Sequence, residues 1–320
     1  MCDNIKNLPD QVEKLFEQQL STWEQARNNF DALKNVEVKE LDVDSMKIKV
    51  QFNPARMHSS GAKVDAKSIA ARKCFLCGAN RPDVQKGIPW KGVSGNEYTI
   101  LINPFPIFPR HLTIPDNNHT LQLIKGRIAD MIRLTSQLSD YTVFYNGPKC
   151  GASAPDHFHF QAGNSDFLTL AENMEKVSLE PLLTDPEGGA VLSVSLNSLP
   201  LNFFVIDATD ADAAQKLFDK LYAAMPVPEG ESEPMMNLLC YITEDETARL
   251  IIIPRKRHRP SFYGTEEGQM VLSPASVDMG GVFITPRPQD FQTLDPQLVG
   301  QTFSELCLNE DEINKIIEKL

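Results

Sequence analysis

Apolar residues recur along the chain at helical spacing in some segments and in short runs in others. Residues 8–26 carry apolar side chains three or four positions apart, which predicts an amphipathic helix that packs on the domain or forms a dimer contact. A second helical period starts near His119 and continues to about Leu138. Strands are expected at residues 36–52 in two pieces around 42–45, and at 97–102, 112–115, 141–145 and 157–161.

The second half of the chain repeats this order of elements without the histidines of the first half. Residues 250–260 parallel residues 112–115, since both begin as an apolar run that ends at a proline. The expected elements are a strand at 201–206, a helix at 212–224, a hairpin of 237–243 and 249–254, and a final helix at 309–320.

The stretch from Asn146 to Gln161 concentrates the chemically active side chains. In an extended strand, successive side chains point to opposite faces, so His157, His159 and Gln161 share one face and the phenylalanines between them pack on the other. An edge strand with a solvated polar stripe would give the same alternation. A chemical site is favoured because two of the six histidines lie here, and because the preceding glycines and serine suit a backbone that passes beside a phosphate.

Two basic segments are candidate anion sites. The loop at residues 52–63 carries Arg56 and Lys63 among turn-forming residues, which suits phosphate binding. Residues 255–259 form a short basic run after an apolar strand, in a chain that is otherwise acidic. The candidates in this run are Arg255, Arg257 and His258. A solvated surface is the alternative for both segments.

Composition and charge narrow the classes of function. The 31 basic and 43 acidic residues give a net charge of −12, which argues against nucleic acid as a partner and requires any anion site to be a local pocket. Six cysteines without disulfide-like spacing suggest a reducing compartment, and Cys74-x-x-Cys77 could hold zinc, act in redox chemistry or be incidental. No signal peptide opens the chain and no apolar run approaches the about 18 residues of a membrane span, so a cytoplasmic protein without a membrane partner is expected.

The motif His157-x-His159-x-Gln161 after Asn-Gly-x-x-x-Gly-x-Ser resembles the transferase branch of the histidine-triad superfamily. That branch contains galactose-1-phosphate uridylyltransferase, diadenosine tetraphosphate phosphorylase and the GDP-hexose phosphorylases. The resemblance implies that His159 is the nucleophile that takes up a nucleotidyl group and that Gln161 steadies the phosphate. Asp156 departs from the pattern, because the residue before the first histidine is commonly proline, and Ser153 lies one position from the serine that it would match.

The same resemblance implies a structural zinc site and a set of substrate contacts. In galactose-1-phosphate uridylyltransferase, zinc is held by a Cys-x-x-Cys pair, a histidine after a Ser-Pro-Asp-like turn and the first histidine of the motif. The counterparts here are Cys74, Cys77, His119 and His157, although His119 could instead serve only a turn. The segment Asn-Pro-Phe-Pro-Ile-x-Pro-x-His looks like the phosphorylase branch, where it lines the nucleotide pocket. The implied substrate contacts are Arg56, Lys63, Arg110, Asn146, Lys149 and Ser153, with His111 either a contact or a structural histidine.

The fold implied by the resemblance is α+β, with two histidine-triad-like units of antiparallel sheet duplicated within one chain. Residues 1–50 would form an N-terminal helix and strands, 51–190 the catalytic unit and 191–320 a second, degenerate unit. The expected activity is nucleotidyl transfer from a nucleoside diphosphate hexose to phosphate or a sugar 1-phosphate. A dinucleoside polyphosphate phosphorylase or hydrolase and a non-catalytic nucleotide-binding scaffold are the alternatives, and a homodimer is left open.

Overall fold

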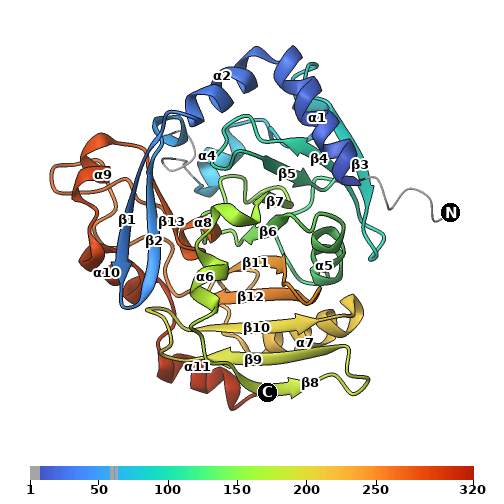
Figure 1. The fold of residues 1–320 in the computed structure, drawn as a ribbon, viewed down its shortest axis with the longest axis vertical. Helices are drawn as coiled ribbons and strands as arrows, with labels where there is room; N and C mark the ends of the chain where they lie inside the picture. The colour runs from blue at the N-terminus through green and yellow to red at the C-terminus, as the bar shows by residue number, and fades with distance from the viewer. Residues whose placement is uncertain (1–7, 58–60, 62–63) are drawn as a thin grey trace.

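The computed structural model describes residues 8–57, 61 and 64–320, and its centre is a ten-stranded antiparallel sheet. The strands of this sheet are β3 Gly87–Lys91, β4 Glu97–Ile102, β5 His111–Pro115, β6 Tyr141–Asn146, β7 His159–Asn164, β8 Glu180–Thr184, β9 Ala190–Ser195, β10 Phe203–Ala208, β11 Met236–Ile242 and β12 Ala248–Pro254. They lie in the order β3-β4-β5-β7-β6-β11-β12-β10-β9-β8 (Figure 1). Every pair of neighbours in this order is antiparallel.

The two halves of this sheet have one topology. In each half the spatial order from the outer edge is first, second, third, fifth and fourth strand, and a helix connects the third strand to the fourth. That helix is α5 (Ile128–Gln137) in the first half and α7 (Ala211–Ala224) in the second. The halves join through β6 and β11, where Asn146 lies opposite Asn237. The expected α+β fold of two duplicated antiparallel units is therefore confirmed.

The remaining elements cover the two faces of the sheet. A small sheet contains β1 Glu37–Val43, β2 Met46–Phe52 and β13 Val282–Thr285 in the order β1-β2-β13. The other helices are α1 Leu8–Thr22, α2 Glu24–Leu33, α4 Ala66–Ala70, α6 Leu170–Met174, α8 Ser276–Met279, α9 Pro288–Thr293, α10 Pro296–Leu306 and α11 Glu310–Ile317, with short 3₁₀ turns η2 Pro54–Arg56, η3 Gly78–Asn80 and η4 Ser165–Phe167. No described helix combines the length and the apolar character that crossing a membrane requires.

Each face of the main sheet packs against its own apolar core. Phe158 and Phe160 point to the face that carries α5 and α7, and they are completely buried there. On the opposite face, the second half of the sheet is filled by aliphatic side chains such as Val205 and Ile251, which pack against the small sheet and α10. The same face of the first half carries His159 and Gln161 instead, next to a cavity. This difference makes the first half the candidate for chemistry.

Four sequence predictions about the elements need correction. The helix expected from near His119 begins only at Ile128, since Gly126 has a φ of 74° and ends the preceding loop in a left-handed conformation. The strand expected at residues 157–161 begins only at His159, so His157 stands just before it. Residues 250–254 belong to β12, which occupies the place of β7 and not that of β5. The N-terminal helical pattern is split into α1 and α2 at Trp23, whose backbone is extended.

The proposed domain limits stay a prediction. The strand β8 lies within the proposed range 51–190 of the first unit, but it pairs with β9 at the outer edge of the second half of the sheet.

Candidate active site

A cavity of about 480 Å³ opens beside β7, on the face of the sheet opposite α5. His159 and Gln161 reach it from β7, Asn146 from the end of β6, Ser153 from the following loop and Arg56 from η2. Five of the residues selected from the sequence therefore meet at one cavity. Its volume lies within the range of about 300–1,000 Å³ that is usual for small-molecule sites.

The backbone before β7 fixes the tautomer of His159. The Nδ1 atom of His159 lies 2.8 Å from the carbonyl oxygen of His157, which can only accept, so Nδ1 carries the proton. The lone pair is therefore on Nε2, which has no hydrogen-bond partner among the residues that the structure describes. Burial is the main reason that the pKa of His159 is lowered to about 4, which keeps the ring neutral and nucleophilic near pH 7.

The amide of Gln161 is oriented by His111, which is completely buried. The backbone N–H of Ile107 donates to His111 Nδ1 (3.1 Å), so the proton of His111 is on Nε2, which donates to Gln161 Oε1 (3.1 Å). Burial and the charge of Arg56 lower the pKa of His111 to about 3, which keeps this tautomer neutral. With its oxygen occupied, Gln161 presents its NH₂ group to the cavity as a donor.

Asn146 is oriented in the same way, by residues of the second half of the sheet. Its Oδ1 accepts from the backbone N–H of Ser276 (2.7 Å) and from Asn237 Nδ2 (3.0 Å). The guanidinium of Arg255 in turn donates to Asn237 Oδ1 and to the carbonyl oxygen of Pro274. The NH₂ group of Asn146 is therefore the part of this amide that is left for a ligand, as it is in Gln161.

Two arginines line the cavity. Arg56 is half-buried and donates to the carbonyl oxygen of Phe105 (2.8 Å). Arg72, which the sequence analysis missed, pairs with Asp156 and lies 4.9 Å from the ring centre of Phe75. The departure from the family motif at Asp156 thus has a structural role. A basic pair directly before the Cys-x-x-Cys motif of an acidic chain was the signal that could have identified Arg72.

The loop between β6 and β7 passes the cavity through a tight glycine turn. Gly151 lines the cavity and has a φ of 93°, a conformation that side chains with a Cβ rarely adopt. A Cβ atom at this position would collide with Ala275 of the second half. The glycine is therefore required where this loop packs against the second half of the chain, and the close approach of the backbone to a phosphate stays a prediction.

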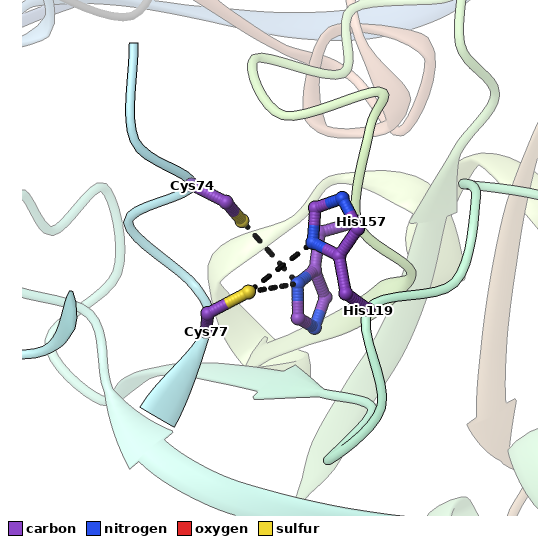
Figure 2. A group of neighbouring side chains, drawn as sticks. All are labelled: Cys74, Cys77, His119 and His157. Atoms are coloured by element: carbon purple, nitrogen blue, oxygen red, sulfur yellow. Dashed lines mark hydrogen bonds between the residues drawn. The ribbon is translucent and has the colours of Figure 1, made fainter. Parts of the chain in front are cut away.

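The four predicted metal ligands lie together (Figure 2). The Nδ1 atom of His157 is 3.3 Å from Cys74 Sγ and 3.5 Å from Cys77 Sγ, and His119 Nδ1 is 3.2 Å from Cys77 Sγ. Tetrahedral zinc with Zn–S of about 2.3 Å and Zn–N of about 2.0 Å requires sulfur and nitrogen about 3.5 Å apart. The Nε2 atom of His157 donates to the carbonyl oxygen of Asp116 (2.8 Å), so Nδ1 is free for a metal ion. The donor set and its spacing fit one divalent ion.

Several predicted binding residues lie away from this cavity. Arg110 forms a two-point ion pair with Glu13 of α1, which corrects the expectation that it lines the pocket. Arg257 pairs with Glu305 of α10. Arg255 is buried and serves Asn237, which replaces its expected contact with substrate by a structural role.

Three further predicted contacts lie elsewhere or outside the described residues. Lys149 and His258 line a separate cavity of about 500 Å³, together with Arg259. The Nζ atom of Lys149 is 3.6 Å from a carboxylate oxygen of Glu231. Lys63 lies outside the described residues.

Comparison with known proteins gives the relatives of this fold. The structure of yeast Ap4A phosphorylase Apa2 in complex with Ap4A matches with a TM-score of 0.57 and 17% identity, covering 89% of this chain and 97% of that chain. Its complex with AMP matches with a TM-score of 0.55 and 16% identity, covering 90% and 96%. A family described as a domain of unknown function (DUF4922) matches residues 15–164, and no curated protein sequence matches the chain. The chain therefore has the fold of yeast Ap4A phosphorylase Apa2.

Proposed function

We propose that the chain transfers a nucleotidyl group through a covalent intermediate on His159. One observation carries the proposal: Nε2 of His159 holds a free lone pair at the cavity, because Nδ1 is committed to the carbonyl oxygen of His157. Gln161 and Asn146 present amide N–H groups to the same cavity, and Arg56 supplies positive charge. These are the groups that an attack on a phosphate ester requires.

The reaction would proceed by two displacements. In the first, the Nε2 lone pair attacks the α-phosphorus of the donor, a P–N bond forms, and the bond from phosphorus to the leaving oxygen breaks. In the second, an oxygen of a phosphate acceptor attacks the same phosphorus and the P–N bond breaks, which regenerates neutral His159. Gln161 donates hydrogen bonds but has no acidic proton. The site therefore suits leaving groups such as nucleotides, which depart as stable anions.

A dinucleoside polyphosphate is the proposed donor, with inorganic phosphate as the acceptor. Support comes from the shared fold, because the similar enzyme from yeast is an Ap4A phosphorylase whose structures contain Ap4A and AMP. With Ap4A and phosphate, transfer of the AMP group would yield ADP and release ATP. A nucleoside diphosphate hexose is the second candidate donor. It is favoured by the Cys₂His₂ cluster, which resembles the zinc site of galactose-1-phosphate uridylyltransferase.

We also propose that Cys74, Cys77, His119 and His157 hold zinc. Four protein ligands leave no open coordination position, so the ion would stabilise the structure and would not activate substrate. His157 is the residue through which the site would act, because its carbonyl oxygen accepts the hydrogen bond that sets the tautomer of His159. A metal ion that fixes His157 would therefore keep His159 in the tautomer whose Nε2 lone pair is free.

Labelling of the protein tests the nucleophile. Wild-type chain mixed with Ap4A labelled at the α-phosphorus, without phosphate, should retain the label in an acid-labile, alkali-stable bond, as expected for a phosphoramidate. Addition of phosphate should discharge the label as ADP. His159→Asn should abolish the labelling and lower turnover about a thousandfold or more. The control Arg249→Met, which alters an ion pair with Asp207 in the second half, should label normally.

Parallel reactions identify the donor and the acceptor. Ap4A, UDP-glucose and a GDP-hexose would each be incubated with and without inorganic phosphate, and the products separated. Phosphate-dependent formation of ADP and ATP from Ap4A supports the phosphorylase, AMP formed without phosphate indicates a hydrolase, and a hexose 1-phosphate product indicates the second candidate. Full turnover by His159→Asn on the best substrate would contradict the mechanism.

A further inference from the structure

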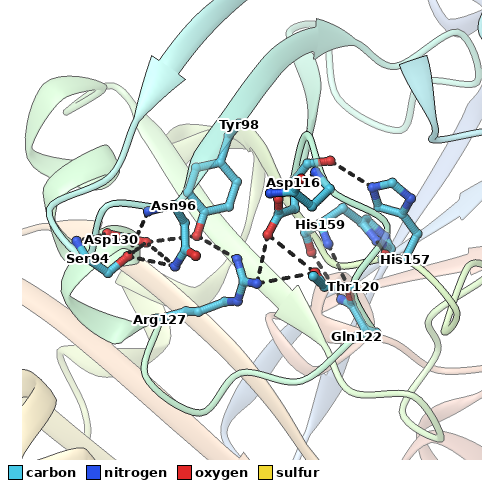
Figure 3. A network of polar contacts seen from close by, with 11 residues as sticks. Ser94, Asn96, Tyr98, Asp116, Thr120, Gln122, Arg127, Asp130, His157 and His159 are labelled. Carbon is cyan, nitrogen blue, oxygen red and sulfur yellow. Dashed lines mark hydrogen bonds and ion pairs between the residues drawn. The ribbon is translucent and has the colours of Figure 1, made fainter. Parts of the chain in front are cut away.

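A nearly buried arginine, Arg127, lies in a network of polar contacts that includes Tyr98 and Asp116 (Figure 3). Arg127 precedes α5 and exposes only 12% of its side chain. Its guanidinium lies 4.0 Å from the ring centre of Phe158, the residue between the two histidines of the motif. Arg127 contacts neither the cavity nor the Cys₂His₂ cluster directly.

Arg127 also forms an ion pair with the residue that holds His157. Its Nη2 lies 2.7 Å from Asp116 Oδ2. The carbonyl oxygen of Asp116 accepts a hydrogen bond from His157 Nε2 (2.8 Å). The backbone N–H of Asp116 donates to the carbonyl oxygen of Phe158 (3.0 Å). The other carboxylate oxygen of Asp116 accepts from the backbone N–H of Asn118. The position of Asp116, and with it the orientation of the His157 ring, therefore depends on this ion pair.

The guanidinium is held in place from its other side. Its Nη1 donates to the hydroxyl oxygen of Tyr98 (2.9 Å), and this hydroxyl donates to Asp130 Oδ2 (2.8 Å). Asp130 is completely buried and also accepts from the backbone N–H and the hydroxyl of Ser94. The plane of the guanidinium is thus fixed by Asp116 and Tyr98 before it meets the ring of Phe158.

We infer that Arg127 is a positioning residue for both His157, the proposed metal ligand, and His159, the proposed nucleophile. Through Asp116 it holds His157 with Nδ1 toward the cysteines, and through Phe158 it holds the backbone that joins His157 to His159. The nucleophile is reached through one further contact, because His159 Nδ1 donates to the carbonyl oxygen of His157. The inference rests on the proposed function, since it concerns the alignment of the proposed metal ligand and nucleophile.

Two substitutions and a matched control separate positioning from general stability. Arg127→Met removes the ion pair and the Tyr98 contact while it keeps an apolar side chain beside Phe158. Arg127→Lys keeps a positive charge for Asp116 but loses the planar group that contacts Asp116, Tyr98 and Phe158 together. Arg249→Met removes an ion pair with Asp207 between β10 and β12, away from the site.

Metal affinity is the primary measurement because it needs no turnover. Each chain is loaded with zinc and titrated with a chromophoric chelator, and cobalt(II) replaces zinc to report the ligand geometry by its absorption spectrum. We expect metal affinity to fall about 10- to 100-fold in Arg127→Met and less in Arg127→Lys. The kcat should fall in the same order, while KM for the nucleotide changes little because Arg127 does not line the cavity. Arg249→Met should behave as wild type in all measurements.

The outcomes are distinct. Wild-type metal affinity and kcat in folded Arg127→Met would overturn the inference, as would an equal loss in Arg249→Met. If Arg127→Met does not fold, wild-type values in Arg127→Lys would overturn it instead. A wild-type chain that binds no metal ion would refute the metal site on which the inference rests, which is a different result from a normal metal site that is indifferent to Arg127.

Discussion

Substitution of His111 tests whether this buried histidine acts on the reaction only through Gln161. His111→Asn places an amide oxygen near the position of Nδ1, where it can still accept from the backbone N–H of Ile107, but it removes the Nε2 donor to Gln161. His111→Gln does the reverse, because its amide reaches the position of Nε2 and can donate to Gln161. The pair therefore separates the orientation of Gln161 from the stability of the loop.

The expected effect on turnover follows from the hydrogen bond that is lost. One neutral hydrogen bond contributes about 1 kcal/mol, so its loss would leave Gln161 misoriented part of the time and lower kcat about fivefold. If the side-chain amide of Gln161 flipped completely, its NH₂ group would no longer donate to the phosphate, and kcat would fall about 100-fold. We expect His111→Asn to lie between these limits, with KM little changed. His111→Gln should keep kcat within about threefold and lose about 1–3 kcal/mol of unfolding free energy, because the N–H of Ile107 becomes unpaired.

Steady-state kinetics on the donor found by product analysis and urea unfolding of the same samples give both quantities. A double variant completes the test: His111→Asn added to Gln161→Leu should cause no further loss of kcat, since the residue that His111 orients is already absent. Additive losses would show that His111 affects the reaction independently. Wild-type kcat in His111→Asn would refute the proposed orientation of Gln161.

Two further predictions concern the metal site and a buried carboxyl group. Cys74→Ser should reduce zinc from about one ion per chain to background and lower the melting temperature, whereas Cys240→Ala, a buried thiol outside the cluster, should retain the ion; metal content at the wild-type level in Cys74→Ser would contradict the site. Burial raises the pKa of Glu233 from 4.5 to about 7, so the folded chain keeps a proton that the unfolded chain releases at lower pH. The free energy of unfolding should therefore decrease by up to about 3 kcal/mol as pH rises from about 4.5 to 7. Glu233→Gln should reduce this decrease in urea unfolding at several pH values, and an unchanged pH dependence would exclude Glu233 as its source.

The spacing of residues along one strand was sufficient to predict part of the candidate site. Alternation within one extended segment placed His159 and Gln161 on one face and the phenylalanines on the other, because successive side chains of a strand point to opposite faces whatever the rest of the chain does. The repeated order of strands and helices likewise predicted a duplicated fold. The ligand cluster needed the resemblance as well, because His119 lies 42 positions from Cys77 and no local pattern connects them.

The tertiary structure decided which polar groups are available for a ligand. From sequence, Arg110 and Arg255 looked as suitable for phosphate as Arg56, but contacts with Glu13 and Asn237 commit the first two elsewhere. The sequence gives the charge of a side chain, whereas its hydrogen-bond or ion-pair partner depends on which distant segments the fold brings within about 3 Å.

The orientation of the two amides has the same origin. Gln161 is turned by His111 from the neighbouring strand, and Asn146 by Asn237 from the other half of the chain. The sequence by itself therefore determined which groups could carry the chemistry and which strand presents two of them. The direction in which those groups face was decided only by the tertiary structure, because each is held by a hydrogen bond to a residue far away in the chain.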